Sequence, residues 1–144
     1  MRSYLDKIEN IIQETYCQIT GYTPQIKQNQ KEIQYSGQPV SIIERFDLYD
    51  ANFLPSNQQK LEVIISCCRT DQEQVPRPAI LVDIDFMYRI YVNGKENSNN
   101  QASTILTAEQ ENHLKQFGQE LEQSLSQIEE LQQIASTKLG IPRF

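Results

Sequence analysis

The sequence predicts an α+β fold, with a mainly antiparallel sheet of about three to five strands between an N-terminal helix and a long C-terminal helix. Three observations lead to this class. Residues 80–92 alternate in polarity as a strand does, and residues 3–20 and 107–138 carry apolar residues at helical spacing. The links between the expected strands are too short for crossover helices, which favours antiparallel pairing. The simplest arrangement is a two-layer sandwich with both helices on one face of the sheet.

Residues 3–20 form the first expected helix. Its apolar residues recur at spacings of three, four and seven positions: Tyr4, Ile8, Ile11, Ile12 and Ile19. Gly21 is expected to end the helix, because glycine readily adopts the left-handed conformation common at helix C-termini. A polar connection at 23–31 then leads to an expected strand at 32–36 and a turn at 37–39.

Two further strands are expected around 40–48 and 61–67. In the first, Val40, Ile42, Phe46 and Leu48 share one parity, which Glu44 interrupts. In the second, the apolar set is Leu61, Val63, Ile65 and Cys67. Residues 50–59 and 70–78 contain prolines and read as loops.

Residues 80–92 are expected to form one long strand with two different faces. Successive side chains of a strand point to opposite sides, so the even-numbered apolar residues should face the core. The other face would stay accessible and carries Leu81, Asp83, Asp85, Met87, Arg89 and Tyr91. This mixture of apolar and charged residues is typical of an interface, so these six residues are the candidate partner-binding site. The dipeptide 93–94, Asn-Gly, favours a hairpin turn, but the segment after it is nearly devoid of apolar residues, so the return strand is expected to be short or absent.

The C-terminal helix is expected over residues 107–138. Thr107 and Gln110 have the spacing of a capping box, and the apolar stripe comprises Leu114, Phe117, Leu121, Leu125, Ile128, Leu131 and Ala135. A helix of about 30 residues would be roughly 45 Å long, more than twice the span of a short strand. The helix is therefore expected to kink near Gly118, to pack along the first helix, or to pair with another chain. Most of the stripe is expected to be core.

Length and composition indicate one domain over residues 1–144. The chain has a formal net charge of −6, which works against binding to phosphate backbones, so nucleic acid is not an expected partner. The sequence contains no unbroken apolar run long enough to cross a membrane, and a cytoplasmic location is expected. The cysteines, Cys17, Cys67 and Cys68, have neither disulfide-framework nor zinc-knuckle spacing and are read as packing residues.

Asp83 and Asp85 also suggest a metal site. Two positions apart on a strand, their carboxylates would project from one face and could share a divalent cation. The string 82–86 resembles, over five residues, the metal-binding strand of nucleotidyltransferase palm domains and nucleotide cyclases. That resemblance implies phosphoester chemistry, which would need a further acid from Glu44, Asp47 or Glu62. The simpler interpretation is that both acids keep the exposed face of the strand in water, and no metal or cofactor is predicted.

His113 is the only histidine in the chain. A catalytic role would need a nucleophile beside it, for which Cys67 or Cys68 are the candidates, and no motif supports such a pair. An exposed helix histidine is the simpler interpretation. At the C-terminus, Ile141 and Phe144 follow the expected end of the helix. The tail is expected to fold back onto the domain; the alternative is that it forms a short docking peptide for another protein.

The leading functional hypothesis is a non-catalytic interaction protein, similar to an adaptor or chaperone. It would bind a protein partner, or a second copy of itself, through the exposed sheet face or the C-terminal helix. In architecture alone, such a two-layer sandwich is similar to secretion chaperones and several small adaptor families. Two alternatives remain from the sequence: a metal-dependent enzyme that acts on a nucleotide or phosphoester through Asp83 and Asp85, and a small-ligand sensor.

Overall fold

A computed structural model describes residues 3–29, 41–52, 60–70, 76–86, 89–92, 95–97 and 106–139. These residues form one N-terminal helix, one antiparallel sheet and two C-terminal helices. The predicted α+β class is confirmed. The expected strand at 32–36, the turn at 37–39 and the C-terminal tail lie outside the described residues.

The first helix, α1, covers Ser3–Thr20, and its apolar stripe faces the interior, with Ile8, Ile12 and Tyr16 fully buried. It ends as predicted: Gly21 adopts a φ of 82°, and its N–H donates to the Cys17 carbonyl oxygen at 2.9 Å. No described helix has the length and the apolar character needed to span a membrane.

The sheet is an antiparallel meander in which the strands follow one another in chain order from β1 to β6. The strands are β1 (Gln25–Gln28), β2 (Ser41–Tyr49), β3 (Leu61–Thr70), β4 (Pro76–Phe86), β5 (Arg89–Val92) and β6 (Lys95–Asn97). The first strand falls in a segment expected to be a polar connection. Its sequence has almost no alternation of apolar and polar residues. The strand forms through hydrogen-bonded pairing with β2, in which Ile26 lies opposite Leu48.

The expected long strand over 80–92 is wrong in one respect, because the chain turns back between Phe86 and Arg89. Register pairs Phe86 with Arg89 and Ile84 with Tyr91, so β4 and β5 are neighbours rather than one continuous strand. A two-residue connection reverses the parity of everything that follows it. The backbone positions of Arg89 and Tyr91 therefore do not continue the row of Leu81, Asp83 and Asp85, and Met87 lies outside the described residues. Val92 pairs with Lys95, so of the two alternatives left by the sequence, a short return strand or none, the short strand is present.

A register shift in β2 takes Ile42 off the face predicted for it and leaves Glu44 as a carboxylate on the core face. The shift lies between Ile42 and Glu44, so Ile42 pairs with Ser66 while Glu44 pairs with the buried Ile65. Glu44 thus lies on the same face as Phe46, where the hydroxyl of Tyr4 and the side-chain amide of Gln28 donate to its carboxylate at 3.0 and 2.9 Å.

The C-terminal helical segment is two helices, α2 (Ala108–Ser126) and α3 (Glu129–Leu139). The predicted capping box is present: Thr107 Oγ1 accepts from Gln110 N at 3.1 Å, and Gln110 Oε1 accepts from Thr107 N at 2.8 Å. The break comes at Gln127–Ile128 and not near Gly118. Because the helix is broken there, neither part extends far beyond the sheet: α2 packs on α1 and β4, and α3 packs on β2, β3 and β4.

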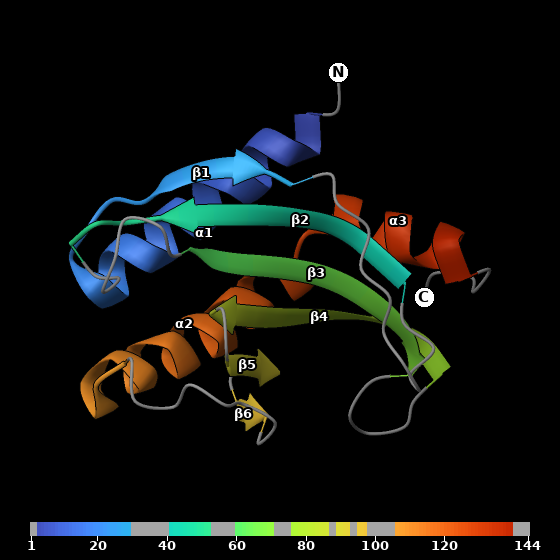
Figure 1. The fold of residues 1–144 in the computed structure, drawn as a ribbon. Helices are drawn as coiled ribbons and strands as arrows, with labels where there is room; N and C mark the ends of the chain where they lie inside the picture. The colour runs from blue at the N-terminus through green and yellow to red at the C-terminus, as the bar shows by residue number, and fades with distance from the viewer. Residues whose placement is uncertain are drawn as a thin grey trace.

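One hydrophobic cluster joins the helices to the sheet, and it contains the whole predicted stripe from Leu114 to Ala135. Within it, the rings of Tyr16 and Phe117 meet edge to face at 5.5 Å between centroids. In Figure 1 the sheet is seen from the face that does not contact the helices, so α1 and α3 lie behind the strands. We call the face of the sheet without a described helix the outer face.

Tyr16 provides a test of this packing. Its buried hydroxyl donates to Asp50 Oδ2 at 2.8 Å, and burial raises the pKa of the phenol far above its usual value. Tyr16→Phe would leave the buried Asp50 carboxylate short of a donor, so we expect it to lower the free energy of unfolding by about 1–3 kcal/mol. Urea denaturation measures this. Tyr22→Phe, at a tyrosine that is 42% exposed, is the matched control and should change little; equal effects would contradict the packing.

Candidate functional site

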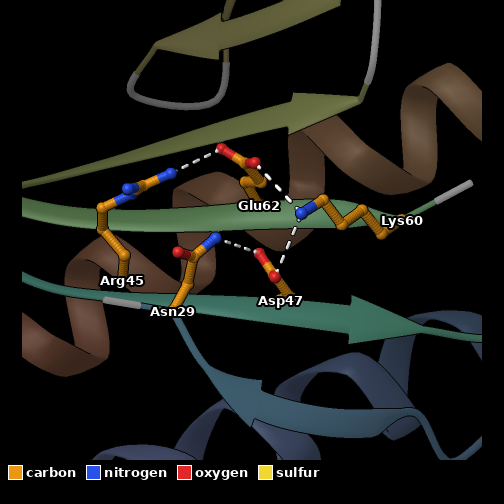
Figure 2. A network of polar contacts seen from close by, with 5 residues as sticks. All are labelled: Asn29, Arg45, Asp47, Lys60 and Glu62. Atoms are coloured by element: carbon orange, nitrogen blue, oxygen red, sulfur yellow. Dashed lines mark hydrogen bonds and ion pairs between the residues drawn. The ribbon is translucent and has the colours of Figure 1, made fainter. Parts of the chain in front are cut away.

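The outer face carries a network of charged and polar side chains that crosses the sheet (Figure 2). Strand alternation places them there. Phe46, Leu48, Leu61 and Val63 point into the core, so the residues between them project from the other side. Arg45, Asp47 and Glu62 occupy these positions, and Asn29 and Lys60 flank them. We call these five residues the charged network.

The contacts of the charged network link β2 to β3. Lys60 Nζ lies 3.1 Å from Asp47 Oδ2 and 3.4 Å from Glu62 Oε1, so one ammonium group bridges two carboxylates. Burial acts to lower the pKa of Lys60, but its hydrogen bond to Asp47 and the two nearby negative charges outweigh this effect, so the pKa is raised. Asn29 Nδ2 donates a hydrogen bond to the other carboxylate oxygen of Asp47, Oδ1, at 2.8 Å. Lys60 thus links an acidic residue of β2 to one of β3.

Arg45 is the most deeply buried member of the charged network, at 4% exposed. Its Nη2 donates to Glu62 Oε2 at 3.0 Å. Its other nitrogens, Nε and Nη1, are buried and find no hydrogen-bond acceptor within the part of the chain that the structure describes. Burying N–H groups without an acceptor is costly, which makes this guanidinium group exceptional on the sheet.

The three candidate residues of β4 that are described all lie on one side of that strand. Ile80, Val82 and Ile84 are buried against the helices, so Leu81, Asp83 and Asp85 alternate to the outer face, as predicted. Their accessibility is lower than predicted. Leu81 and Asp85 are half-buried and Asp83 is only 7% exposed, so the expectation of an open acidic face is wrong at Asp83. Sequence alternation identifies which face a residue lies on, but it does not give the exposed fraction of its side chain.

Asp85 extends the charged network onto β4. Register pairs Asp47 with Glu62 and Glu62 with Asp85, which gives three carboxylates in one row across β2, β3 and β4. Burial and then the charge of Glu62 raise the pKa of Asp85 to about 6, against the opposing influence of Arg45 and Lys60. Asp85 therefore titrates near neutrality, unlike an ordinary surface aspartate.

A second shifted carboxyl lies at the contact between α2 and β4. Glu122 Oε2 accepts from the Val82 backbone N–H at 3.1 Å, which fastens the helix to the strand. Burial raises the pKa of Glu122 to about 7; the Val82 hydrogen bond opposes this shift and the charge of Asp83 adds to it. This contact was not foreseen from the sequence, where Glu122 belongs to a run of acidic residues on a helix.

The acids considered for a metal site are divided between two faces. Glu62 lies directly opposite Asp85, Asp47 is one strand further away in the same row, and Glu44 is on the core face. Among the described residues, no group of three or more His, Cys, Asp or Glu side chains has the arrangement of a metal site. His113 is half-buried on α2, and Cys67 lies in the core while Cys68 alternates to the other side of β3.

The sequence analysis missed Arg45 and Lys60. The signal for Arg45 was present, because it occupies an outward position between Glu44 and Phe46 in a strand whose pattern was recognised. Lys60 precedes β3 and was assigned to the margin of a loop. Its contacts with carboxylates on two strands could not be predicted, because the alternation within one strand does not show which residues of other strands lie nearby.

The charged network gives a first prediction. Glu62→Gln removes the carboxylate shared by Arg45 and Lys60 and leaves a buried guanidinium group unbalanced, so we expect the free energy of unfolding to fall by roughly 3 kcal/mol. Chemical denaturation measures the loss. Lys7→Met, which breaks the exposed pair between Lys7 and Glu130, is the control and should leave the unfolding midpoint nearly unchanged. A similar small effect for both variants would contradict the proposed burial.

The shifted carboxyls give a second prediction. The folded-state pKa values, about 6 for Asp85 and about 7 for Glu122, lie above the ordinary values of 3.8 and 4.5. The folded chain thus binds these protons more tightly than the unfolded chain. The resulting stability is fully present at acidic pH, and it is lost as pH rises through about 6 to 7.

Unfolding free energies measured between about pH 5 and pH 8 should therefore decrease toward pH 8, by on the order of 1 kcal/mol or more for each group. Glu122→Gln retains an acceptor for Val82 and should flatten this dependence. Glu120→Gln, which removes the same charge from the same helix, should not. An unchanged pH profile in Glu122→Gln would rule out this origin.

Comparison of the chain with known protein families, with curated proteins and with solved structures finds no significant match.

Proposed function

We propose that this chain is a non-catalytic interaction protein that binds a protein partner through the outer face of its sheet. The charged network is the observation that carries the proposal. The hydrophobic cluster on the opposite face already holds the helices to the sheet, and buried ion pairs are poor sources of net stability because both charges lose water. Charges held in fixed positions are well suited to recognition, where complementarity selects the partner.

The C-terminal helices are the less favoured of the two surfaces considered from the sequence. Their apolar residues are buried in the core of the chain itself. These are Leu114, Phe117, Leu121 and Leu125 of α2, and Leu131, Ala135 and Leu139 of α3. Among the residues whose burial the structure describes, the one exposed large apolar side chain is Tyr22. A chaperone-like grip on apolar segments is therefore less favoured than polar recognition at the outer face.

Self-association and a cytoplasmic location remain predictions from the sequence. A metal-dependent reaction at Asp83 and Asp85 is not favoured, because the two acids differ in exposure and Asp85 lies beside Lys60 and Arg45. No observation favours a small-ligand sensor.

Site-specific photo-crosslinking tests the proposal. We expect benzoylphenylalanine at Leu81, on the outer face, to give a discrete adduct in extracts of the native cell, and the same group at Gln133, exposed on α3, to give none. The captured protein, once purified, should bind the unmodified chain, and light scattering distinguishes it from a second copy. Adducts of equal yield from both positions, or none from Leu81, would contradict the proposal.

A further inference from the structure

One side of β4 is only partly covered by its neighbour in the sheet. The strand runs over Pro76–Phe86, but its register with β5 is confined to residues 83–86. Residues 76–82 therefore have β3 on one side and no described strand on the other. Figure 1 shows β5 beside one end of β4 only. A strand edge of this kind presents backbone N–H and C=O groups to which a strand of another molecule can add.

This part of β4 also contains the segment of the chain that is most prone to such pairing. Residues 79–82, Ala-Ile-Leu-Val, are the longest unbroken apolar run in the sequence. Short apolar segments with high strand propensity and no charge pair readily with identical segments of other copies. A second copy of this chain is therefore the molecule that this edge has to exclude.

The helix α2 supplies a side chain that covers one backbone donor of the edge. Glu122 Oε2 accepts from the Val82 N–H at 3.1 Å. Because the N–H groups of an antiparallel strand alternate between its two sides, those of Ile80 and Val82 both point away from β3. Phe86, which flanks the two-residue connection to β5, has the same parity and faces β5. The carboxylate of Glu122 thus occupies the position that a carbonyl oxygen of an added strand would take.

Two prolines protect the beginning of the same strand. Pro76 and Pro78 lie in β4 directly before the apolar run. Proline has no N–H, so neither residue can donate to an added strand, whichever way it faces. Among the even-numbered residues from 76 to 82, only Ile80 has an N–H that is neither removed by proline nor bound by Glu122.

We propose that Glu122, Pro76 and Pro78 block the edge of β4 and prevent a second copy of this chain from adding a strand there. Charge acts in the same direction as the lost hydrogen bonds. Asp83 is close enough for its charge to act on Glu122, so two copies that met at this edge would bring two such acidic pairs together. The edge is separate from the outer face, and the inference does not depend on the proposed function.

The test measures self-association of the full chain by sedimentation equilibrium over a range of protein concentrations. Glu122→Ala removes both the acceptor and the cover of the Val82 N–H, so we expect the association constant to rise about tenfold or more above that of the wild-type chain. Glu120→Ala removes the same charge from the same helix and should change the constant by less than about twofold. Glu122→Gln keeps an oxygen that accepts from Val82 and should also remain within about twofold.

Two further measurements locate the association at β4. Ala79→Lys places a charge on the edge strand and, combined with Glu122→Ala, should restore the association constant of the wild-type chain. Hydrogen exchange of the Val82 amide should be faster in Glu122→Ala than in the wild-type chain at low protein concentration, and it should slow as the protein associates.

Thermal unfolding of each variant, followed by circular dichroism, controls for folding. If Glu122→Ala does not unfold cooperatively, Glu122→Met replaces it, because methionine keeps the volume of the side chain and lacks the carboxylate. Loss of folding in both variants would mean that Glu122 is required for the fold itself and would overturn the inference. An unchanged association constant in the folded variant, or an equal rise in Glu120→Ala or Glu122→Gln, would overturn it as well. Association that persists with Ala79→Lys would place the contact on another surface, with the same consequence.

Discussion

The division of the sheet into an apolar face and a charged face is the constraint on which the rest of the structure depends. It is clearest in β3, where Leu61, Val63, Ile65 and Cys67 are fully buried against the helices. The residues between them, Glu62, Ile64 and Ser66, point the other way, and Ile64 and Ser66 are buried there too, at 4% and 1% exposed. Because side chains alternate strictly along a strand, a chain that buries one face against helices must place everything else on the opposite face. The helices and the charged network are two consequences of this division.

On the apolar side, the constraint determines the course of both terminal segments. A single straight helix over residues 107–138 would extend beyond the sheet and expose part of its stripe. The break at Gln127–Ile128 redirects the chain, so that Leu125 and Leu131 both reach the core although they belong to different helices. Hydrogen bonds compensate for the break, since Gln132 Nε2 donates to the Ser126 carbonyl oxygen at 3.0 Å. The free energy gained by burying the apolar side chains of both helices thus outweighs the backbone hydrogen bonds lost where the helix is interrupted.

On the charged side, the same constraint brings charged side chains close together and removes water from them, although each would be better hydrated alone. Arg45 and Asp83 are nearly inaccessible, and Asp85 titrates well above an ordinary aspartate. Desolvation of this kind needs exact pairing, which Glu62 and Lys60 provide in part. Asp85, the next acid of the row on β4, forms no ion pair with any residue that the structure describes, and its partial burial leaves its pKa raised to about 6.

The amino-acid sequence was sufficient for the α+β class, for α1 and its end at Gly21, for the capping box at Thr107, and for the inward set of Ile80, Val82 and Ile84. These are local properties, because helical period, strand alternation and capping are encoded within a few residues. The strand β1, the reversal after Phe86 and the union of Arg45, Lys60, Glu62 and Asp85 were decided by tertiary structure alone. Their cause is pairing between distant segments: register determines which side chains become neighbours, and periodicity within one strand carries no information about the strand beside it.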